Sequence, residues 1–173
     1  MKRYPILLAL AALASFPSSA QNPASVDARF ENPGRFTDFR ARRWSDPRET
    51  EALVVELRRW IESEAPRFLP AGSKLTVTIT DVDMAGEFEP WHRADSTDVR
   101  VVREIHPSRV SLAFSLADET GKVVMQGERK LISAFVLGGI LRGGDGPLGY
   151  EKALLADWLK REFARDGARH AER

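Results

Sequence analysis

The densest group of side chains that could do chemistry lies between residues 81 and 92. It combines carboxylates with an indole and an imidazole: Asp81, Asp83, Glu87, Glu89, Trp91 and His92. Asp81 and Asp83 are two residues apart at the end of a predicted strand, which places their side chains on one side, about 7 Å apart along the chain. Carboxylates at this spacing, with an imidazole nearby, could hold a hard divalent cation. They could also divide acid and base roles if their surroundings push their pKa values apart.

The same residues have a purely structural interpretation. Aspartates at the end of a strand commonly accept hydrogen bonds from backbone amides and order the turn that follows. Gly86 would supply a positive φ or a close approach in that turn. The sequence favours this role over a metal site made from Asp81, Asp83, Glu89 and His92, and over catalysis. The calcium-loop pattern of alternating aspartates, a glycine and a distal glutamate is absent.

A second candidate surface lies between the last predicted strand and the last predicted helix. Ile132–Leu141 is strongly apolar, and Gly138–Gly149 is rich in glycine. The apolar segment is either a last buried strand or an exposed patch that docks a partner. Flexibility explains the glycines better than phosphate binding, because no Gly-Lys-Ser/Thr ending follows them. We expect the 83–92 loop, this glycine loop and the flanking residues Phe135 and Leu137 to contact a partner.

Composition narrows the possible functions. The chain has no cysteine, which rules out disulfides, thiolate metal sites and a cysteine nucleophile. No serine lies in a Gly-x-Ser-x-Gly elbow. Lys and Arg number 26 against 25 Asp and Glu, and this balance gives nucleic-acid binding no electrostatic basis. The sequence therefore predicts no catalytic residue, no cofactor and no nucleic-acid partner.

The first twenty residues predict export. Lys2 and Arg3 precede a short apolar stretch, and Ser18-Ser19-Ala20 offers the small residues that a signal peptidase recognises. The stretch is shorter than the roughly 20 apolar residues that span a membrane. We expect cleavage of the signal peptide after Ala20 and a periplasmic protein with no transmembrane segment. Residues 21–166 would then form one domain, followed by a flexible polar tail at 167–173.

Two amphipathic helices are predicted to support these groups. Asp46, Pro47 and Glu49 form a helix start, with a cap, a proline at the first position and a glutamate three residues after the cap. Pro66 predicts the end of that helix near the residue before it. A second helix is predicted at Tyr150–Phe163, from apolar stripes at helical spacing.

The strands follow from alternation of apolar and polar residues. They are predicted at Val26–Phe30, Leu75–Thr80, Val99–Ile105, Val110–Leu116 and Val123–Leu131. The last two form a hairpin. The order of elements indicates an α+β fold, a mostly antiparallel sheet of about five strands with two amphipathic helices packed on one face. The other face, rich in Thr and Ser, would be wet or covered by a partner.

Several separated motifs carry a family resemblance. They are Phe36-Thr37-Asp38, Leu69–Gly72, Thr80–Trp91, Asp98–Val102, Gly127–Leu131, Tyr150-Glu151-Lys152 and Asp157-Trp158-Leu159. Together they resemble the bacterial family catalogued as domain of unknown function 3016, which implies an exported bacterial protein and provides no catalytic residues to carry over. The hairpin around Asp118–Gly121 is also similar to those in small α+β modules of envelope proteins, such as the amino-terminal domain of TolB. That second likeness concerns the fold alone.

Two functions remain open from the sequence. The first is a non-enzymatic periplasmic module that binds another protein or a small component of the cell envelope. The second is a metal-dependent or carboxylate-based hydrolase centred on the Asp81-Asp83-Glu87-Glu89-His92 loop. The substitution Asp83→Ala separates them. It would remove activity or metal affinity from an enzyme, but would lower thermal stability if Asp83 only orders a turn.

Overall fold

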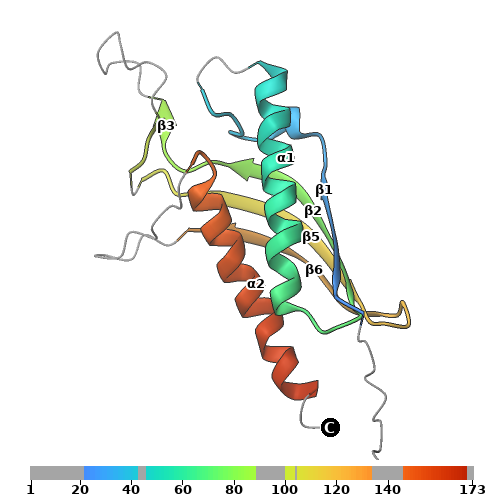
Figure 1. Cartoon of the computed structure of the whole chain (residues 1–173). Helices are drawn as coiled ribbons and strands as arrows, with labels where there is room; N and C mark the ends of the chain where they lie inside the picture. The colour runs from blue at the N-terminus through green and yellow to red at the C-terminus, as the bar shows by residue number, and fades with distance from the viewer. Residues whose placement is uncertain (1–21, 43–45, 89–99, 104, 134–145, 171–173) are drawn as a thin grey trace, which may run out of the picture.

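The structure is a computed structural model that describes residues 22–42, 46–88, 100–103, 105–133 and 146–170, with side chains up to residue 163 (Figure 1). Its elements in chain order are β1 (Ser25–Phe30), η1 (Pro33–Arg35), α1 (Pro47–Glu64), η2 (Ala65–Phe68), β2 (Lys74–Asp83), β3 (Glu87–Phe88), β4 (Arg100–Val101), β5 (Arg109–Ala117), β6 (Val123–Ile132) and α2 (Gly149–His170). The α+β class predicted from the sequence is confirmed.

The main sheet has four strands in the order β1-β2-β5-β6, and β3 pairs with β4 in a separate small sheet. β1 runs parallel to β2, with Ala28 opposite Val77, because α1 returns the chain along the sheet between them. The β2–β5 and β5–β6 pairs are antiparallel. The predicted hairpin is therefore confirmed. Alternation does not determine strand direction, so the parallel pair is a finding of the structure.

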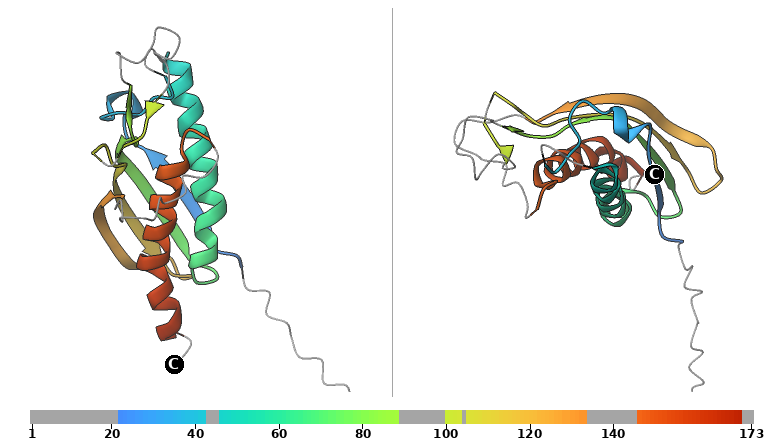
Figure 2. Two further views of the ribbon diagram at one scale, coloured as in Figure 1. Left: turned by 90° about the vertical axis from the view of Figure 1, so that its left-hand side faces the viewer. Right: turned by 90° about the horizontal axis from the view of Figure 1, so that it is seen from above.

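Both helices lie on one face of the main sheet, as Figure 2 shows from the side and from above. The core forms between the helices and the apolar side chains of β2 and β5. At its centre the ring of Phe114 meets the rings of Trp158 and Phe163 edge to face, at centroid distances of 5.6 and 5.7 Å. Half-buried Thr and Ser side chains such as Thr78 and Ser111 lie on the opposite face, which no described element covers.

The first helix begins and ends where its sequence predicts. The Asp46 side chain accepts a hydrogen bond from the backbone N–H of Arg48 at 2.5 Å, and Pro47 occupies the first turn. The helix ends at Glu64, before Pro66, and continues as the short 3-10 helix η2. Its core face consists of four buried residues: Leu53, Val54, Leu57 and Ile61.

Two predicted boundaries differ from the structure. β4 covers only Arg100–Val101 of the strand predicted at Val99–Ile105, because the backbone N–H of His106 donates to the carbonyl of Arg103 and turns the chain there. α2 spans Gly149–His170, whereas the sequence predicts a helix at Tyr150–Phe163. In the described part of the chain, no helix has the length and apolar character needed to span a bilayer.

Candidate functional site

A β-bulge decides where the predicted carboxylates point. In β2, Ile79 pairs with Leu112 and Asp81 with Ser111, so Thr80 is an extra residue on its strand. Strict alternation from Leu75 would have placed Asp81 toward the core, because it lies at the same parity. The bulge reverses the pattern. Val82 is buried against the helices, and Asp81 lies on the uncovered face, half-buried.

Asp81 binds the segment that follows β1. Its Oδ1 accepts from the backbone N–H of Thr37 at 2.7 Å, and its Oδ2 accepts from the Thr37 hydroxyl at 2.8 Å. The neighbouring residue Asp38 runs parallel to the end of β2, donating its N–H to Val82 and accepting from the N–H of Met84. The Asp81 carboxylate therefore joins a returning segment to the sheet instead of ordering the turn after β2.

Asp83 and Glu87 are each engaged by a basic side chain. Asp83 accepts from Nη1 of Arg109 across the β2–β5 ladder at 2.8 Å. Glu87 lies 3.1 Å from Nε2 of His106. Both pairs are partly exposed, so their contribution to stability is small. Their common effect is to fix the chain on either side of the turn at Gly86.

Arg100 is the centre of a larger network at the same end of the sheet. Its Nη1 donates to Asp38 and to the carbonyl of Gly86, both at 2.9 Å, and its Nη2 donates to the carbonyl of Arg40 at 2.9 Å. Its guanidinium also lies 4.4 Å from the ring centroid of Phe88. The Arg100 side chain is only 11% exposed, so this network joins three segments in a region that is largely shielded from water.

Glu151 is a buried carboxyl that the sequence did not single out as a site residue. It lies in the first turn of α2 and is 1% exposed. Its Oε1 accepts from the backbone N–H of Ala85 at 3.0 Å and from the hydroxyl of Ser108 at 2.9 Å, while Oε2 has no partner among the described residues. Burial raises the pKa of Glu151, although these two hydrogen bonds and the positive charge of Arg100 act in the opposite direction. Its position in an amphipathic helix gave no signal to distinguish it from a surface glutamate.

These contacts leave little free chemistry at the carboxylates. Asp38, Asp81, Asp83 and Glu87 are each bound by threonine, arginine or histidine. Within the part of the chain that the structure describes, no three His, Asp or Glu side chains are grouped so that they could hold a metal ion. The geometry of the described carboxylates joins chain segments to one another, and Glu87 forms a carboxylate–imidazole pair with His106.

The remaining predicted site residues lie outside the described residues. These are Glu89, Trp91, His92, Phe135 and Leu137. The residues that flank them are described, however, and they lie close to the same network. Phe88 and Arg100 pair with each other in the small sheet. Ser133, the last described residue after β6, donates its backbone N–H to Ser108 at 2.9 Å.

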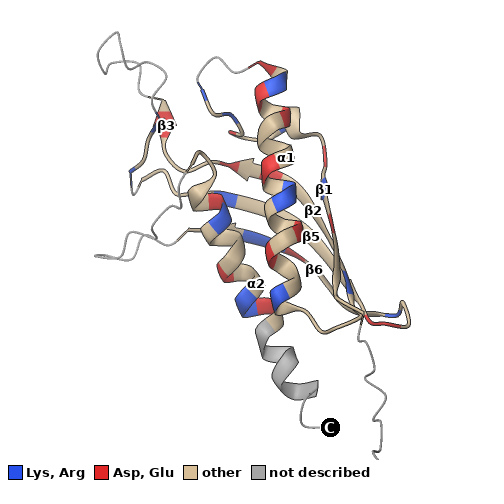
Figure 3. Ribbon diagram, viewed as in Figure 1, with Lys and Arg blue, Asp and Glu red and all other residues tan. Residues whose placement is uncertain are grey.

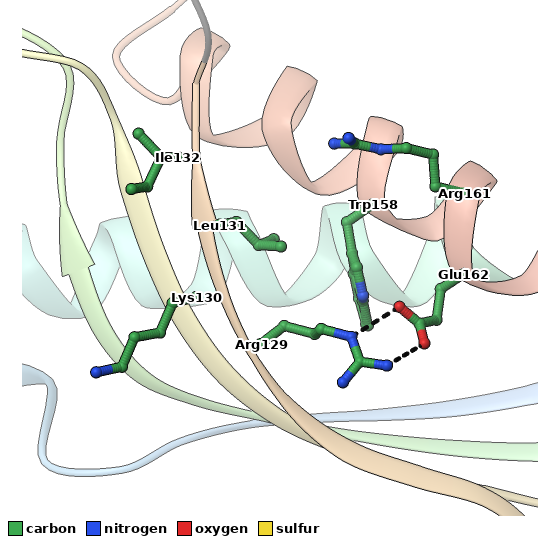
Figure 4. Close-up of a pocket in the computed structure, with 7 residues that line it drawn as sticks. All are labelled: Arg129, Lys130, Leu131, Ile132, Trp158, Arg161 and Glu162. Atoms are coloured by element: carbon green, nitrogen blue, oxygen red, sulfur yellow. Dashed lines mark hydrogen bonds and ion pairs between the residues drawn. The ribbon is translucent and has the colours of Figure 1, made fainter.

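A cleft of about 460 Å³ opens between the edge strand β6 and α2 (Figure 4). Its lining combines Trp158 from α2 with Leu131 from β6, together with five further residues: Arg129, Lys130, Ile132, Arg161 and Glu162. Arg129 crosses the cleft and binds Glu162 through Nε at 2.9 Å and through Nη2. Nε1 of Trp158 is buried and has no hydrogen-bond partner in the described part of the chain.

Charges of both signs are interspersed along α1 and α2, as Figure 3 shows.

The fold and this site together define a small two-layer α+β protein in which side-chain hydrogen bonds join three segments at one end of the sheet. The sequence profile of the family described as "Protein of unknown function (DUF3016)" matches residues 24–161. The chain therefore belongs to the DUF3016 family, as its motifs indicate. A comparison with curated proteins found no match.

Proposed function

We propose that this protein is a non-enzymatic binding module of the cell envelope, exported to the periplasm, which contacts another envelope protein. The contact surface would be formed by the 83–92 loop and the segment around Phe135 and Leu137. The observation that carries this proposal is the engagement of Asp38, Asp81, Asp83 and Glu87 in bonds within the chain. Such bonds make a rigid base for loops, and binding residues are commonly carried on loops that a rigid scaffold positions.

The two candidate contact segments begin from one anchored region. Residues 89–99 connect Phe88 to Arg100, and Arg100 is bonded to the carbonyl of Gly86. Residues 134–145 follow Ser133, whose backbone is bonded to Ser108. The Ser108 hydroxyl and the Ala85 N–H both donate to Glu151. This buried carboxyl therefore connects the bases of both segments, which supports a single shared contact surface.

The hydrolase alternative has weaker support. It needs carboxylates that are free to bind a metal or to exchange a proton with a substrate. Asp81 uses both of its oxygens on Thr37, and Asp83 is paired with Arg109. Glu89 and His92 lie outside the described residues, so the geometry adds nothing to the sequence argument for them.

A thermal melt in the presence of metals separates the two functions. The protein is melted with chelator and then with Ca²⁺, Mg²⁺, Mn²⁺ or Zn²⁺ added singly. A binding module of the proposed kind shows the same Tm in every case. A rise with one metal that disappears in Asp83→Ala would overturn the proposal and support the hydrolase.

Site-specific photo-crosslinking in living cells tests the contact surface. A photoreactive amino acid is placed at Trp91 or Phe135, and at Thr78 on the uncovered sheet face as the matched control. We expect the same protein adduct from positions 91 and 135 and none from position 78. Adducts from position 78 alone, or from none of the three, would contradict the proposed surface. The amino-terminal sequence of the periplasmic protein, expected to start at Gln21, tests export in the same cells.

A further inference from the structure

The two edges of the main sheet, β1 and β6, differ in how side chains contact their backbone groups. At the β1 edge, side chains from α1 bind the backbone of Ala28. Arg58 donates to its carbonyl at 3.1 Å, and Glu62 accepts from its N–H at 3.5 Å. Side chains that occupy backbone donors and acceptors prevent another strand from pairing there. The β1 edge is therefore blocked at Ala28.

Among the described residues, no strand pairs with the outer edge of β6. The N–H of Ser133 donates toward β5, to Ser108, at 2.9 Å. In an antiparallel ladder the bonding direction alternates, so every second residue of β6 directs its N–H and C=O outward. The described residues that do so are Gln126, Glu128, Lys130 and Ile132. Of the side chains that the structure describes, Arg129 reaches these groups: its Nη1 donates to the carbonyl of Glu128 at 2.8 Å, and that oxygen has a second lone pair.

The side chains of β6 are also compatible with pairing of this edge to another strand. Ile132 and Val124, near the two ends of the strand, are 58% and 56% exposed. Between them the outward residues carry opposite charges, at Glu128 and Lys130. A long exposed edge that carries both signs excludes most strands, but it accepts one with the complementary order of charges. β6 itself, run antiparallel, has that order.

We propose that two copies of this chain pair through β6, antiparallel and edge to edge, about a twofold axis at Arg129. In this register Glu128 lies opposite Lys130 of the second copy, and the reciprocal pair repeats the contact. Leu131 lies opposite Gly127, so a large residue faces a small one at the mouth of the cleft. The result is a continuous eight-stranded sheet. This proposal does not depend on the proposed function, because it uses a different surface.

The position of Arg129 is compatible with the twofold axis. Like charges directly opposite each other would normally oppose pairing. Here each guanidinium is bonded to Glu162 of its own copy (Figure 4). It also lies 5.1 Å from the ring centroid of Phe114. Its charge is therefore neutralised by a carboxylate of its own copy. The twofold axis also places both helix layers on one face of the combined sheet.

Charge reversal tests the register as well as the dimer. The mass of the purified full chain is measured by light scattering and sedimentation over about 1–100 μM, because an edge pair buries little area and is expected to dissociate in the micromolar range. Glu128→Lys places Lys opposite Lys130, and should weaken the dimer at least about tenfold. Adding Lys130→Glu restores the complementary order and should restore the dimer. A wild-type chain that stays monomeric at the highest concentration would overturn the proposal, as would a double variant no better than the single one.

A proline on the open edge provides a second test with its own control. The N–H of Gln126 points outward, so Gln126→Pro removes a donor for edge pairing without removing a bond of the β5–β6 ladder. We expect this variant to be a monomer with an unchanged circular dichroism spectrum, and Gln126→Ala to remain a dimer. Equal dimerisation of the proline and alanine variants would show that the copies associate elsewhere. The crosslinks from positions 91 and 135 should persist in the monomer, which keeps this outcome distinct from the proposed function.

Discussion

Glu151 is the only charged residue that is buried in the described part of the chain. Burying a carboxyl costs free energy, because its charged form is poorly solvated away from water. Two donors, the Ala85 N–H and the Ser108 hydroxyl, bind one of its oxygens. The helix dipole of α2 also favours negative charge in the first turn. These contributions are smaller than the effect of burial. The pKa of Glu151 is therefore raised, and the folded protein favours its protonated form.

The stability of the protein should therefore depend on pH through Glu151. The unfolded carboxyl ionises near its ordinary pKa of 4.5, whereas the folded one holds its proton to higher pH. Stability associated with Glu151 is present below that value and is lost as pH rises through the folded pKa. Glu151→Gln removes this titration, so we expect it to match the wild type at about pH 4 and exceed it at about pH 8 by on the order of 1 kcal/mol. Urea unfolding at both pH values measures the difference, and Glu119→Gln in the exposed hairpin turn serves as the control.

Gly86 is the residue where backbone geometry is most demanding. Its φ is +81°, and an added Cβ would lie 2.5 Å from the carbonyl oxygen of Val101. Gly121 has a φ of +83° but no atom within 4 Å of an added Cβ. Gly121→Ala should cost about 1–2 kcal/mol for conformation alone, and Gly86→Ala about 2–4 kcal/mol because the clash is added. Equal losses in denaturant unfolding would show that the turn at Gly86 relaxes without strain.

At the scale of elements, the small sheet β3–β4 depends on Arg100 for its position. This one side chain bonds the segment before α1, the turn after β2 and the ring of Phe88. Each of those segments is short and has few ladder bonds of its own. Their fixed arrangement therefore comes from side-chain bonds more than from strand pairing.

Removing Arg100 should loosen this end of the molecule while the main sheet remains intact. Arg100→Ala removes the donor to Oδ2 of Asp38 and to two backbone carbonyls, so we expect a loss of about 2–4 kcal/mol. Oδ1 of Asp38 keeps its bond to Nε of Arg40. Arg67→Ala removes an exposed ion pair with Glu64 and should cost at most about 0.5 kcal/mol. Hydrogen exchange provides the local measurement: the Gly86 amide should exchange faster in Arg100→Ala, and that of Val77 should not. Uniform acceleration would mean that Arg100 supports the whole fold.

The candidate site was predictable in part. The spacing of Asp81 and Asp83 predicted a shared side, and their polar character predicted hydrogen bonding. Their partners were not predictable, because Thr37 and Arg109 are distant in sequence and reach them through tertiary pairing. The bulge at Thr80 was not predictable either, since the alternation of apolar residues gives no signal of an inserted residue until Val82 is seen to be buried. The burial of Glu151 was not predictable for a related reason, because it depends on how α2 packs against the turn at Ala85.

At the scale of the whole molecule, all core residues of the described chain lie between Val26 and Phe163. Both helices and the hairpin followed from periodicity and from caps, which are local signals. The parallel pairing of β1 with β2 and the separation of β3–β4 from the main sheet did not follow, because strand order is decided by packing between distant segments.

Removal of the predicted signal peptide should leave this core unchanged. A chain that begins at Gln21 retains every described element, since the first of them starts at Ser25. We expect its Tm and its circular dichroism spectrum to equal those of the full chain within error. A lower Tm for the shorter chain would show that residues 1–20 contribute to the folded state and would count against their role as a cleaved signal.

The parallel β1–β2 pair has a consequence for the order of folding. β5 and β6 are neighbours along the chain and can close as a hairpin within microseconds, whereas β1 cannot pair until α1 and β2 have both been formed and docked. The loop that must close between Ser25 and Lys74 makes this the entropically costly contact. If the chain emerges from a translocation channel amino terminus first, β1 emerges first but is the last strand to pair. The topology thus favours a late, rate-limiting docking of β1 onto a sheet nucleated at its carboxyl-terminal hairpin.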